Sequence, residues 1–352
     1  FRRLPASEHG IPTSCVVNVG EAFGGEQETK RFVTRYLKVT HCDLFFADAA
    51  VLIEGPAERI LIPHFVNSHT EFDKLAESYI TWLEIGGPAR YFAEPTTMSE
   101  LTALISGAAK EHLPVRVLGG GSNLLVQEAG CDGLVLHLSA PELAAIRIDG
   151  CYVTAGGGAK LSHVISRSVG AGLSGLEHLV GIPGTLGGAV VGNAGVVNGD
   201  IGSHVRRVTT LDRQGNVARR ERSELQFSFR RSDLDDVTVV EVELELETGD
   251  AAELTRRMQN SWIVKRAGQP PTDQRAALAF VDPSGITAAE LIEQSGLKGA
   301  VEGEVSLSGQ YPGYIVVSGN ATSQQVLALL DRVRKAIAQR TGIQLQSHLR
   351  IW

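Results

Sequence analysis

The residues best suited to chemistry are small ones, gathered in the glycine-rich stretch LGGGSNLLV at positions 118–126. Glycine has no Cβ and tolerates positive φ, so a backbone of this kind can press directly against a ligand. Successive N–H groups in such a turn form a concave anion site, and Ser122 and Asn123 add side-chain donors. The stretch suits a diphosphate, although a tight loop without a ligand could have the same composition.

A second glycine-rich stretch, SGLEHLVGIPGTLGGAVVGNAG, occupies positions 174–195. Apolar residues are interleaved with its glycines and no repeat runs through it, which argues against a linker or a collagen-like segment. It is not a dinucleotide-binding fingerprint, because a GxGxxG turn after the first strand with an acidic residue further on is absent. Together the two stretches indicate a backbone surface that lies along an elongated ligand.

A pair of arginines is the third group of residues that could do chemistry. Arg230 and Arg231 lie within FSFRRS at positions 227–232. A guanidinium is always charged and can bind a carboxylate through two hydrogen bonds, so it could stabilise negative charge that develops on a substrate. The alternative interpretation is a solvated pair beside Asp233 and Asp235.

Helices and strands must position these residues, and apolar periodicity predicts where they lie. Helical spacing is found over residues 96–111, 161–171, 252–266, 288–295 and 323–340. Apolar runs predict strands over residues 114–118, 133–138, 152–155, 203–217, 238–247, 313–317 and 344–351. In the third helix, the residues expected to face inward are Leu254, Met258, Trp262 and Ile263. This mixture indicates an α+β protein.

Composition narrows the class of protein. The 352 residues are enough for two domains and an appended segment. A net charge of −7 argues against a nucleic-acid-binding surface, and no apolar run is long enough for a membrane span. The four cysteines have neither CxxC nor metal-ligand spacing, so we expect free thiols, no metal site and a cytoplasmic location.

Six motifs together resemble one family. They are IGGPAR at 85–90, LGGGSNLLV at 118–126, GLEHLVGIPGTLGGAVVGNAG at 175–195, FSFRRS at 227–232, QP at 269–270 and AAELIEQSGLKG at 288–299. In this order and spacing, the chain from about Tyr79 to Trp352 resembles the UDP-N-acetylenolpyruvoylglucosamine reductases, the MurB family. The short separation between Ser232 and the helix over 252–266 is similar to the shorter, second type of that family.

The resemblance implies an α+β fold with a vanillyl-alcohol-oxidase (PCMH-type) FAD-binding domain over 79–249 and a smaller α+β substrate-binding domain over 250–352. It implies FAD and NADPH as cofactors and a UDP-sugar as substrate. The activity would be an oxidoreductase step in peptidoglycan precursor synthesis, in which UDP-N-acetylglucosamine enolpyruvate becomes UDP-N-acetylmuramate. We expect a cytoplasmic monomer with no nucleic-acid or membrane partner. The alternatives are a degenerate relative that binds FAD or a UDP-sugar with little turnover, and a flavin oxidoreductase of this fold acting on another substrate.

The resemblance also implies roles for individual residues. The FAD diphosphate would be held by Gly119, Gly120, Gly121, Ser122 and Asn123. The flavin would be lined by Gly181, Ile182, Pro183, Gly184, Thr185, Gly187 and Gly188, with Asn193 near the reacting centre. Arg230 matches the catalytic arginine, while Lys265, Arg266 and Gln269 lie where the UDP part of the substrate would bind. Cations at a helix C-terminus are also favourable without any ligand.

Two departures from the family concern the proton that completes the reduction. The family's SxFKNP motif supplies a serine, sometimes a cysteine, as donor, and the corresponding stretch here begins at Leu278, which cannot donate a proton. The family's C-terminal glutamate falls at about His348, a residue type able to do acid–base work near neutral pH. The family's VSxxHANF motif reads VSLSGQYPGYI at 305–315, without an evident histidine or asparagine. The flavin-binding motifs therefore match better than the catalytic ones.

The first part of the chain, residues 1–70, differs in character. Residues 30–66 resemble the start of a Toprim domain of OLD-type nucleases, in which a carboxylate at a strand end, here Glu54, binds Mg²⁺. The DxD motif that would complete such a site does not follow, and a hard cation needs several oxygen ligands. We therefore expect a truncated remnant.

Overall fold

The computed structural model describes residues 2–3, 14–15, 83–196, 199–271 and 274–352. The chain divides into two compact units, residues 1–77 and 78–352. What is described of the first unit is a short antiparallel pair of β1 (Arg2–Arg3) with β2 (Ser14–Cys15). The Toprim-like stretch over 30–66, including Glu54, lies outside the described residues.

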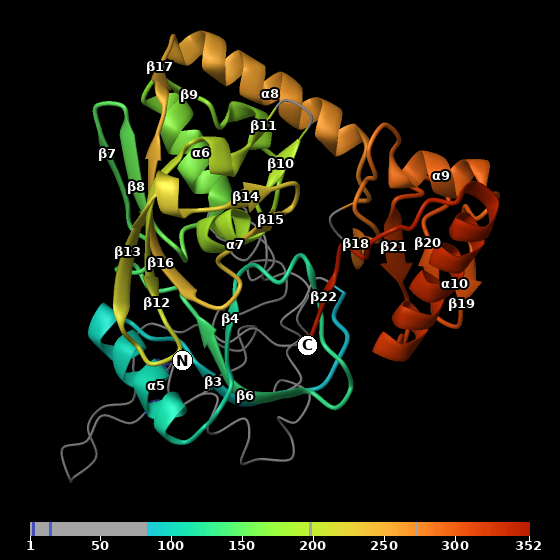
Figure 1. The fold of residues 1–352 in the computed structure, drawn as a ribbon, viewed down its shortest axis with the longest axis horizontal. Helices are drawn as coiled ribbons and strands as arrows, with labels where there is room; N and C mark the ends of the chain where they lie inside the picture. Colours follow the sequence, from blue (N-terminus) through green and yellow to red (C-terminus); the bar gives the residue numbers. More distant parts are fainter. Residues whose placement is uncertain (1, 4–13, 16–82, 197–198, 272–273) are drawn as a thin grey trace. The chain divides into compact units, whose positions relative to one another are not determined.

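The second unit begins with a three-stranded parallel sheet in the order β3-β6-β4 (Figure 1). Its strands are β3 (Ala89–Ala93), β4 (Val115–Leu118) and β6 (Cys131–His137). The crossover helix α5 (Met98–Lys110) is capped by Thr97, and its buried Leu101 and Ile105 pack on Leu136. The glycine-rich stretch follows β4 directly and runs into β5 (Leu124–Leu125), so it lies at the carboxyl end of a strand.

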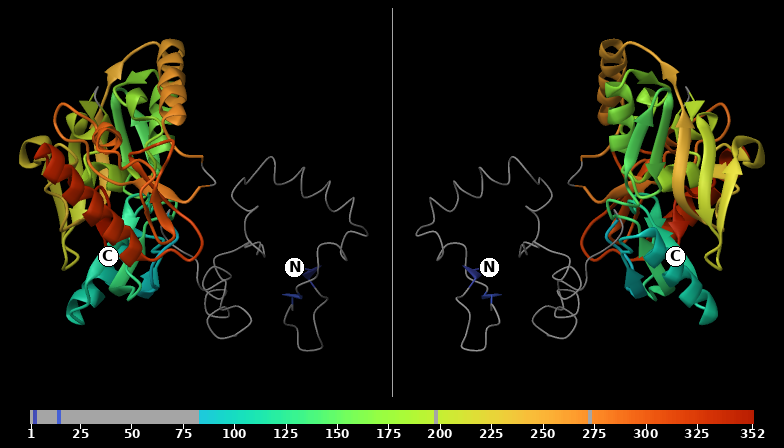
Figure 2. Two further views of the ribbon diagram at one scale, coloured as in Figure 1. Left: turned by 90° about the vertical axis from the view of Figure 1, so that its right-hand side faces the viewer. Right: turned by 90° about the vertical axis from the view of Figure 1, so that its left-hand side faces the viewer.

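A five-stranded antiparallel sheet follows in the order β13-β12-β16-β8-β7. Its strands are β7 (Ile146–Asp149), β8 (Tyr152–Gly156), β12 (Val205–Leu211), β13 (Val217–Glu221) and β16 (Thr238–Glu245). Helices α6 (Leu161–Gly170) and α7 (Leu186–Val191) share a buried core with β8, β12 and β16. Figure 2 shows this sheet from two sides, with the orange helix α8 beside its upper end.

Shorter elements connect these parts. They are β9 (Leu173–Ser174), β10 (Gly195–Val196), β11 (Gly199–Asp200), β14 (Phe227–Ser228), β15 (Arg231–Ser232) and β17 (Glu247–Thr248). The prediction of one strand over 203–217 was wrong, because the chain turns between β12 and β13. Asp212 accepts hydrogen bonds from the N–H groups of Gln214 and Asn216, and Gly215 has φ +87°. A carboxylate that satisfies nearby backbone donors favours a turn.

Helix α8 (Ala251–Ala267) begins after Asp250, whose side chain accepts a hydrogen bond from the N–H of Glu253. Leu254 is buried as expected, but Trp262 and Ile263 are 50% and 59% exposed, so the prediction that they face inward was wrong. The physical reason is visible in Figure 1, where α8 runs past α6 toward the C-terminal part of the chain. Its second half therefore has no core beneath it.

The C-terminal domain is an antiparallel sheet in the order β18-β21-β20-β19, covered on one face by two helices. Its elements are β18 (Ala276–Leu278), α9 (Ala288–Gln294), β19 (Val301–Glu302), β20 (Val305–Leu307), β21 (Tyr314–Val317) and α10 (Ser323–Thr341). Both helices start with a capping box, at Thr287 and Thr322. Capping boxes satisfy donors that a helix start leaves free.

The prediction of a single strand over 344–351 was wrong in extent. Only β22 (Arg350–Ile351) is a strand there, and it pairs in parallel with β5, which lies outside the C-terminal sheet. Just before it, Ser347 forms an isolated bridge with Phe280. The end of the chain thus leaves the C-terminal sheet and returns to the glycine-rich stretch. Among the described residues, no helix has the length and apolar character needed to cross a bilayer.

Candidate active site

The two glycine-rich stretches, some 60 residues apart in sequence, lie against one another. A Cβ added to Gly120 would be 2.7 Å from the Cα of Gly184, and one added to Gly119 would be 2.9 Å from the Oγ1 of Thr185. Gly121 and Gly184 have φ of +65° and +109°, which glycine adopts without strain. The stretches predicted separately therefore form one surface of closely packed backbone, with Ser122 beside it.

A third run of glycines, Gly156 to Gly158, supports this surface from behind. The N–H of Gly187 donates to the carbonyl oxygen of Gly157 at 2.8 Å. A Cβ on Gly158 would lie 1.6 Å from the carbonyl oxygen of Leu138, so no side chain fits. The sequence analysis gave this run no role, although the repeated GGG was a visible signal of close backbone approach.

Asn193 is placed behind the site. It is 1% exposed and has φ +42°. Its Nδ2 donates to Asp200 at 3.0 Å and to the carbonyl of Ser228 at 2.8 Å, and its Oδ1 accepts from the N–H of Gly202 at 3.0 Å. Both amide hydrogens and the amide oxygen are thus used within the protein. The contact of Asn193 with a flavin stays a prediction, and its observed role is to hold the β14–β15 hairpin.

Arg230 occupies the turn of that hairpin with φ +59°, a conformation that costs a non-glycine residue about 1–3 kcal/mol. The turn is held by Asn193 on one strand and, on the other, by Ser232, whose Oγ donates to the carbonyl of Val191 at 2.8 Å. Burial lowers the pKa of Arg230, while Asp282 and Asp200 act in the opposite direction. The guanidinium is thus partly desolvated but stays charged.

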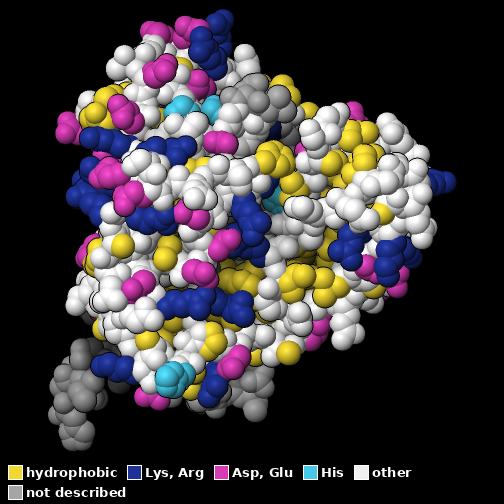
Figure 3. All heavy atoms as spheres, in the orientation of Figure 1, with side chains coloured by type: hydrophobic (Ala, Val, Ile, Leu, Met, Phe, Trp, Pro, Cys, Tyr) yellow, Lys and Arg dark blue, Asp and Glu magenta, His cyan; other side chains and the backbone are white. Residues whose placement is uncertain are grey.

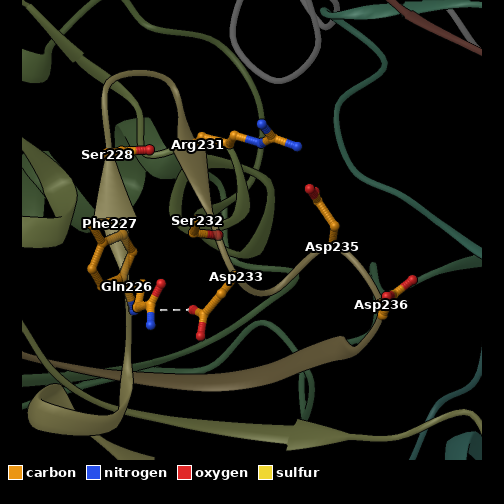
Figure 4. A pocket seen from close by; sticks show the side chains of 8 residues that line it. All are labelled: Gln226, Phe227, Ser228, Arg231, Ser232, Asp233, Asp235 and Asp236. Carbon is orange, nitrogen blue, oxygen red and sulfur yellow. Dashed lines mark hydrogen bonds between the residues drawn. The ribbon is translucent and has the colours of Figure 1, made fainter.

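The neighbouring arginine has a different environment. Arg231 lines an open pocket with Asp233, Asp235 and Asp236, shown in Figure 4. Asp233 is paired with Arg220, and Asp235 accepts a hydrogen bond from Arg350 at 2.6 Å. The interpretation of a solvated basic pair therefore fits Arg231 but not Arg230, which is half-buried on the turn. Figure 3 shows Lys and Arg side chains gathered along the middle of this face, where it is hollowed between the FAD-binding elements and the C-terminal sheet.

The residues predicted to meet the UDP part of the substrate have protein partners. Lys265 donates from Nζ to the carbonyls of His178 and Val180 at 2.7 and 2.9 Å, just before Gly181, where the chain is predicted to line a flavin. Burial and, to a smaller extent, the nearby Arg230 lower the pKa of Lys265 to about 8. Arg266 turns back to the carbonyl of Pro270 at 2.7 Å. Lys265 is therefore brought into the electrostatic range of Arg230, whereas Arg266 is engaged locally.

His348 contacts the glycine-rich stretch directly. Its Nδ1 lies 2.6 Å from the Oδ1 of Asn123. Burial and the adjacent Arg230 lower the pKa of His348 to about 4, although Asp282 opposes this. The imidazole is then neutral at pH 7, and an amide oxygen as partner requires the hydrogen on Nδ1. Nε2 is left as an acceptor, so this form of His348 is poorly suited to be the proton donor. The side chain of Asn123 is therefore occupied by His348.

The family described as "FAD binding domain" matches residues 89–220, and "UDP-N-acetylenolpyruvoylglucosamine reductase, C-terminal domain" matches residues 269–352. A UDP-N-acetylenolpyruvoylglucosamine reductase of Rhodopirellula baltica is 46% identical over 271 residues, which is 77% of this chain and 89% of that protein. The chain belongs to the UDP-N-acetylenolpyruvoylglucosamine reductase family.

Two further members of the MurB family are similar to this chain over most of its length. The reductase of Heliobacterium modesticaldum is 40% identical over 276 residues, covering 78% of this chain and 87% of that one. The crystal structure of MurB from Thermus caldophilus superposes with a TM-score of 0.68 at 33% identity, covering 78% of this chain and 96% of that chain. The Toprim domain of overcoming-lysogenization-defect-like proteins matches residues 45–96. The resemblance to MurB is confirmed, as is the FAD-binding α+β fold. The Toprim resemblance is confirmed over residues 45–96 and not over the whole of the predicted 30–66.

Proposed function

We propose that the protein is an FAD-dependent, NADPH-consuming reductase that converts UDP-N-acetylglucosamine enolpyruvate into UDP-N-acetylmuramate for peptidoglycan synthesis. Family membership over most of the chain supports the reaction. The observation that carries the proposal to this chain is the half-buried Arg230, held on a strained turn with His348 and Lys265 within its electrostatic range.

The glycine surface fits a flavin dinucleotide. A Cβ on Gly120 would lie 2.7 Å from the Cα of Gly184, so this surface is backbone alone, and successive backbone N–H groups in such turns can bind a diphosphate. We propose that Gly119 to Ser122 hold the diphosphate and that Gly181 to Gly188 line the flavin. When bound, FAD supplies the hydride transfer.

Arg230 would bind the carboxylate of the enolpyruvyl group. Negative charge develops on that carboxylate as hydride adds to the neighbouring double bond. A fixed and partly desolvated guanidinium stabilises this charge more strongly than a solvated one. We propose Lys265 as a second cation for the UDP diphosphate, and the neutral Nε2 of His348 as an acceptor in the place of the family's glutamate.

Several finer points are also proposals. We propose domain limits of 79–249 and 250–352, since α8 begins at the Asp250 cap and the C-terminal family description starts at residue 269. We propose a cytoplasmic monomer without a nucleic-acid partner, and the net charge of −7 supports the last point. Residues 1–70 would be a truncated Toprim-like remnant.

One observation favours a second candidate, a family member that binds FAD and a UDP-sugar with little turnover. Leu278, at the family's proton-donor position, is 36% exposed and carries no transferable proton. The two functions are separated by one anaerobic experiment. NADPH is added until the flavin absorbance is bleached, and UDP-N-acetylglucosamine enolpyruvate is then added. Return of the oxidised spectrum with formation of UDP-N-acetylmuramate supports the reductase, and a flavin that stays reduced supports the binding protein.

A further inference from the structure

The neighbouring strands β18 and β21 each differ from the family at one residue, and the two residues lie opposite one another. Leu278 of β18 stands where the family has its donor serine. The family's VSxxHANF motif ends in phenylalanine, and the corresponding stretch here ends in Tyr314 of β21. The β18–β21 register makes Leu278 and Tyr314 direct partners. A hydroxyl is therefore missing on one strand and present on the adjacent one.

Leu278 and Tyr314 point to the same face of the sheet, because direct cross-strand partners always do. The residues next to them, Ala277 and Ile315, are buried in the core beneath α9 and α10. Side chains alternate along a strand, so Leu278 and Tyr314 lie on the opposite face. Figure 1 shows α9 and α10 on the side of this sheet away from α7 and β14. Tyr314 thus projects from the face opposite α9 and α10, and Asp282, four residues after Leu278, is close enough to Arg230 to act on its pKa.

The hydroxyl of Tyr314 lies by the side chain of Gln269, which acts to lower the pKa of Tyr314, but burial outweighs this effect and raises that pKa above its ordinary value of 10. The phenol therefore holds its proton at neutral pH. The other candidates in the site are less suited. The imidazole of His348 is neutral, and its Nδ1–H donates to the side-chain oxygen of Asn123. The ammonium group of Lys265 donates hydrogen bonds to the carbonyl oxygens of His178 and Val180.

We infer that the Tyr314 hydroxyl, placed beside Leu278 by the β18–β21 register, supplies the proton that the family takes from serine. The inference rests on the proposed function. Hydride adds to the methylene carbon of the enolpyruvyl group, and the π electrons of the double bond move to the carbon that bears the carboxylate. That electron pair takes the proton from the Tyr314 oxygen. The phenolate left behind is stabilised by the amide of Gln269 and regains a proton from water.

The test uses the full chain loaded with FAD and the variant Tyr314→Phe, which removes only the hydroxyl. NADPH should bleach the flavin of this variant at the wild-type rate, which also establishes that it is folded. Reoxidation by UDP-N-acetylglucosamine enolpyruvate should slow by about 10²- to 10⁴-fold, the usual value of a general acid. Tyr152→Phe, on β8, is the matched control and should react like the wild type.

A second variant restores the family arrangement. Leu278→Ser combined with Tyr314→Phe should recover most of the lost rate and, in D₂O, show a solvent isotope effect on reoxidation like that of the wild type. Unchanged reoxidation in Tyr314→Phe, or no recovery in the double variant, would overturn the assignment of Tyr314. If the wild type itself is never reoxidised by the enolpyruvyl sugar, the proposed function fails and this inference falls with it.

Discussion

The Nδ1 of His348 lies 2.6 Å from the Oδ1 of Asn123, which joins the last residues of the C-terminal segment to the first glycine-rich stretch. The link is reinforced by the backbone, because the N–H of Arg350 donates to the carbonyl oxygen of Asn123 at 3.0 Å. Asn123 is thus engaged through side chain and main chain by residues more than 200 positions away. The proposed cofactor surface is completed by the end of the chain.

Replacing Asn123 with alanine should therefore affect both stability and cofactor binding. Losing the partly buried hydrogen bond to His348 should cost about 1–2 kcal/mol of folding free energy. The affinity for FAD should fall because the loop loses its anchor. Denaturant unfolding of the apoprotein and flavin titration measure the two effects. Asn260→Ala, at an exposed position of α8, is the control, and equal behaviour of the two variants would contradict the anchoring role.

Replacing Arg230 with lysine keeps the charge but removes two-point binding of a carboxylate. The rate of flavin reoxidation by the enolpyruvyl sugar should fall by about 10²- to 10³-fold, as when one group that stabilises a developing oxyanion is lost. Reduction by NADPH should be unchanged. Arg231→Lys should have little effect, since Arg231 lies in the acidic pocket. Stopped-flow measurement of the two half-reactions decides the matter, and similar losses in both variants would contradict our placement of the active arginine.

Gly120 is expected to tolerate no side chain. In Gly120→Ala, the new Cβ would lie 2.7 Å from the Cα of Gly184, so the two stretches must separate. We expect loss of tight FAD binding, seen as a colourless preparation. Gly107→Ala in α5 is the opposite case, because nothing lies within 4 Å of its added Cβ. The Gly107→Ala change should raise the free energy of unfolding by about 0.5–1 kcal/mol through helix propensity. A yellow preparation of Gly120→Ala, with FAD still bound, would contradict the predicted diphosphate site.

The stability of the protein should depend on His348 in mildly acidic solution. Its pKa falls from 6.5 to about 4 on folding, so below pH 6.5 the unfolded chain binds a proton that the folded protein does not. Stability should therefore decrease as the pH falls from about 6.5 to about 4 and level off below that. Urea unfolding between these limits should show a smaller decrease in His348→Asn than in wild type. His163→Asn, at an exposed position of α6, serves as control and should follow the wild type.

The long periodic elements could be predicted from sequence because their burial is local. The helix predicted over 161–171 is α6 (Leu161–Gly170), and the one over 323–340 is α10 (Ser323–Thr341). The orientation of Trp262 could not be predicted, since a helix repeats its apolar pattern whether or not a core lies beneath it. Similarly, the apolar run before Trp352 did not reveal that its partner would be β5 rather than its own domain's sheet.

In the candidate site, too, local features could be predicted from the sequence and tertiary contacts could not. The glycines of both stretches could be predicted to form a ligand-binding surface, because glycine clusters interleaved with apolar residues are typical of few other structures. Their mutual contact, through Gly120 and Gly184, depends on the fold and had no local signal. The direction of the Asn123 side chain depends on His348, far along the chain. The pairing of Leu278 with Tyr314 is set by strand register, which no spacing within either strand reveals.

The return of β22 to β5 has a mechanical meaning. The C-terminal domain is attached to the preceding part of the chain at several separate places. Helix α8 leads into it, β22 pairs with β5, and Glu128 accepts hydrogen bonds from the N–H and Oγ of Ser323 at the start of α10. Leu83, Ile85 and Leu125 also belong to its buried core. A body fixed at several separate points cannot rotate about any one of them, so we expect the two parts to move together as one rigid unit.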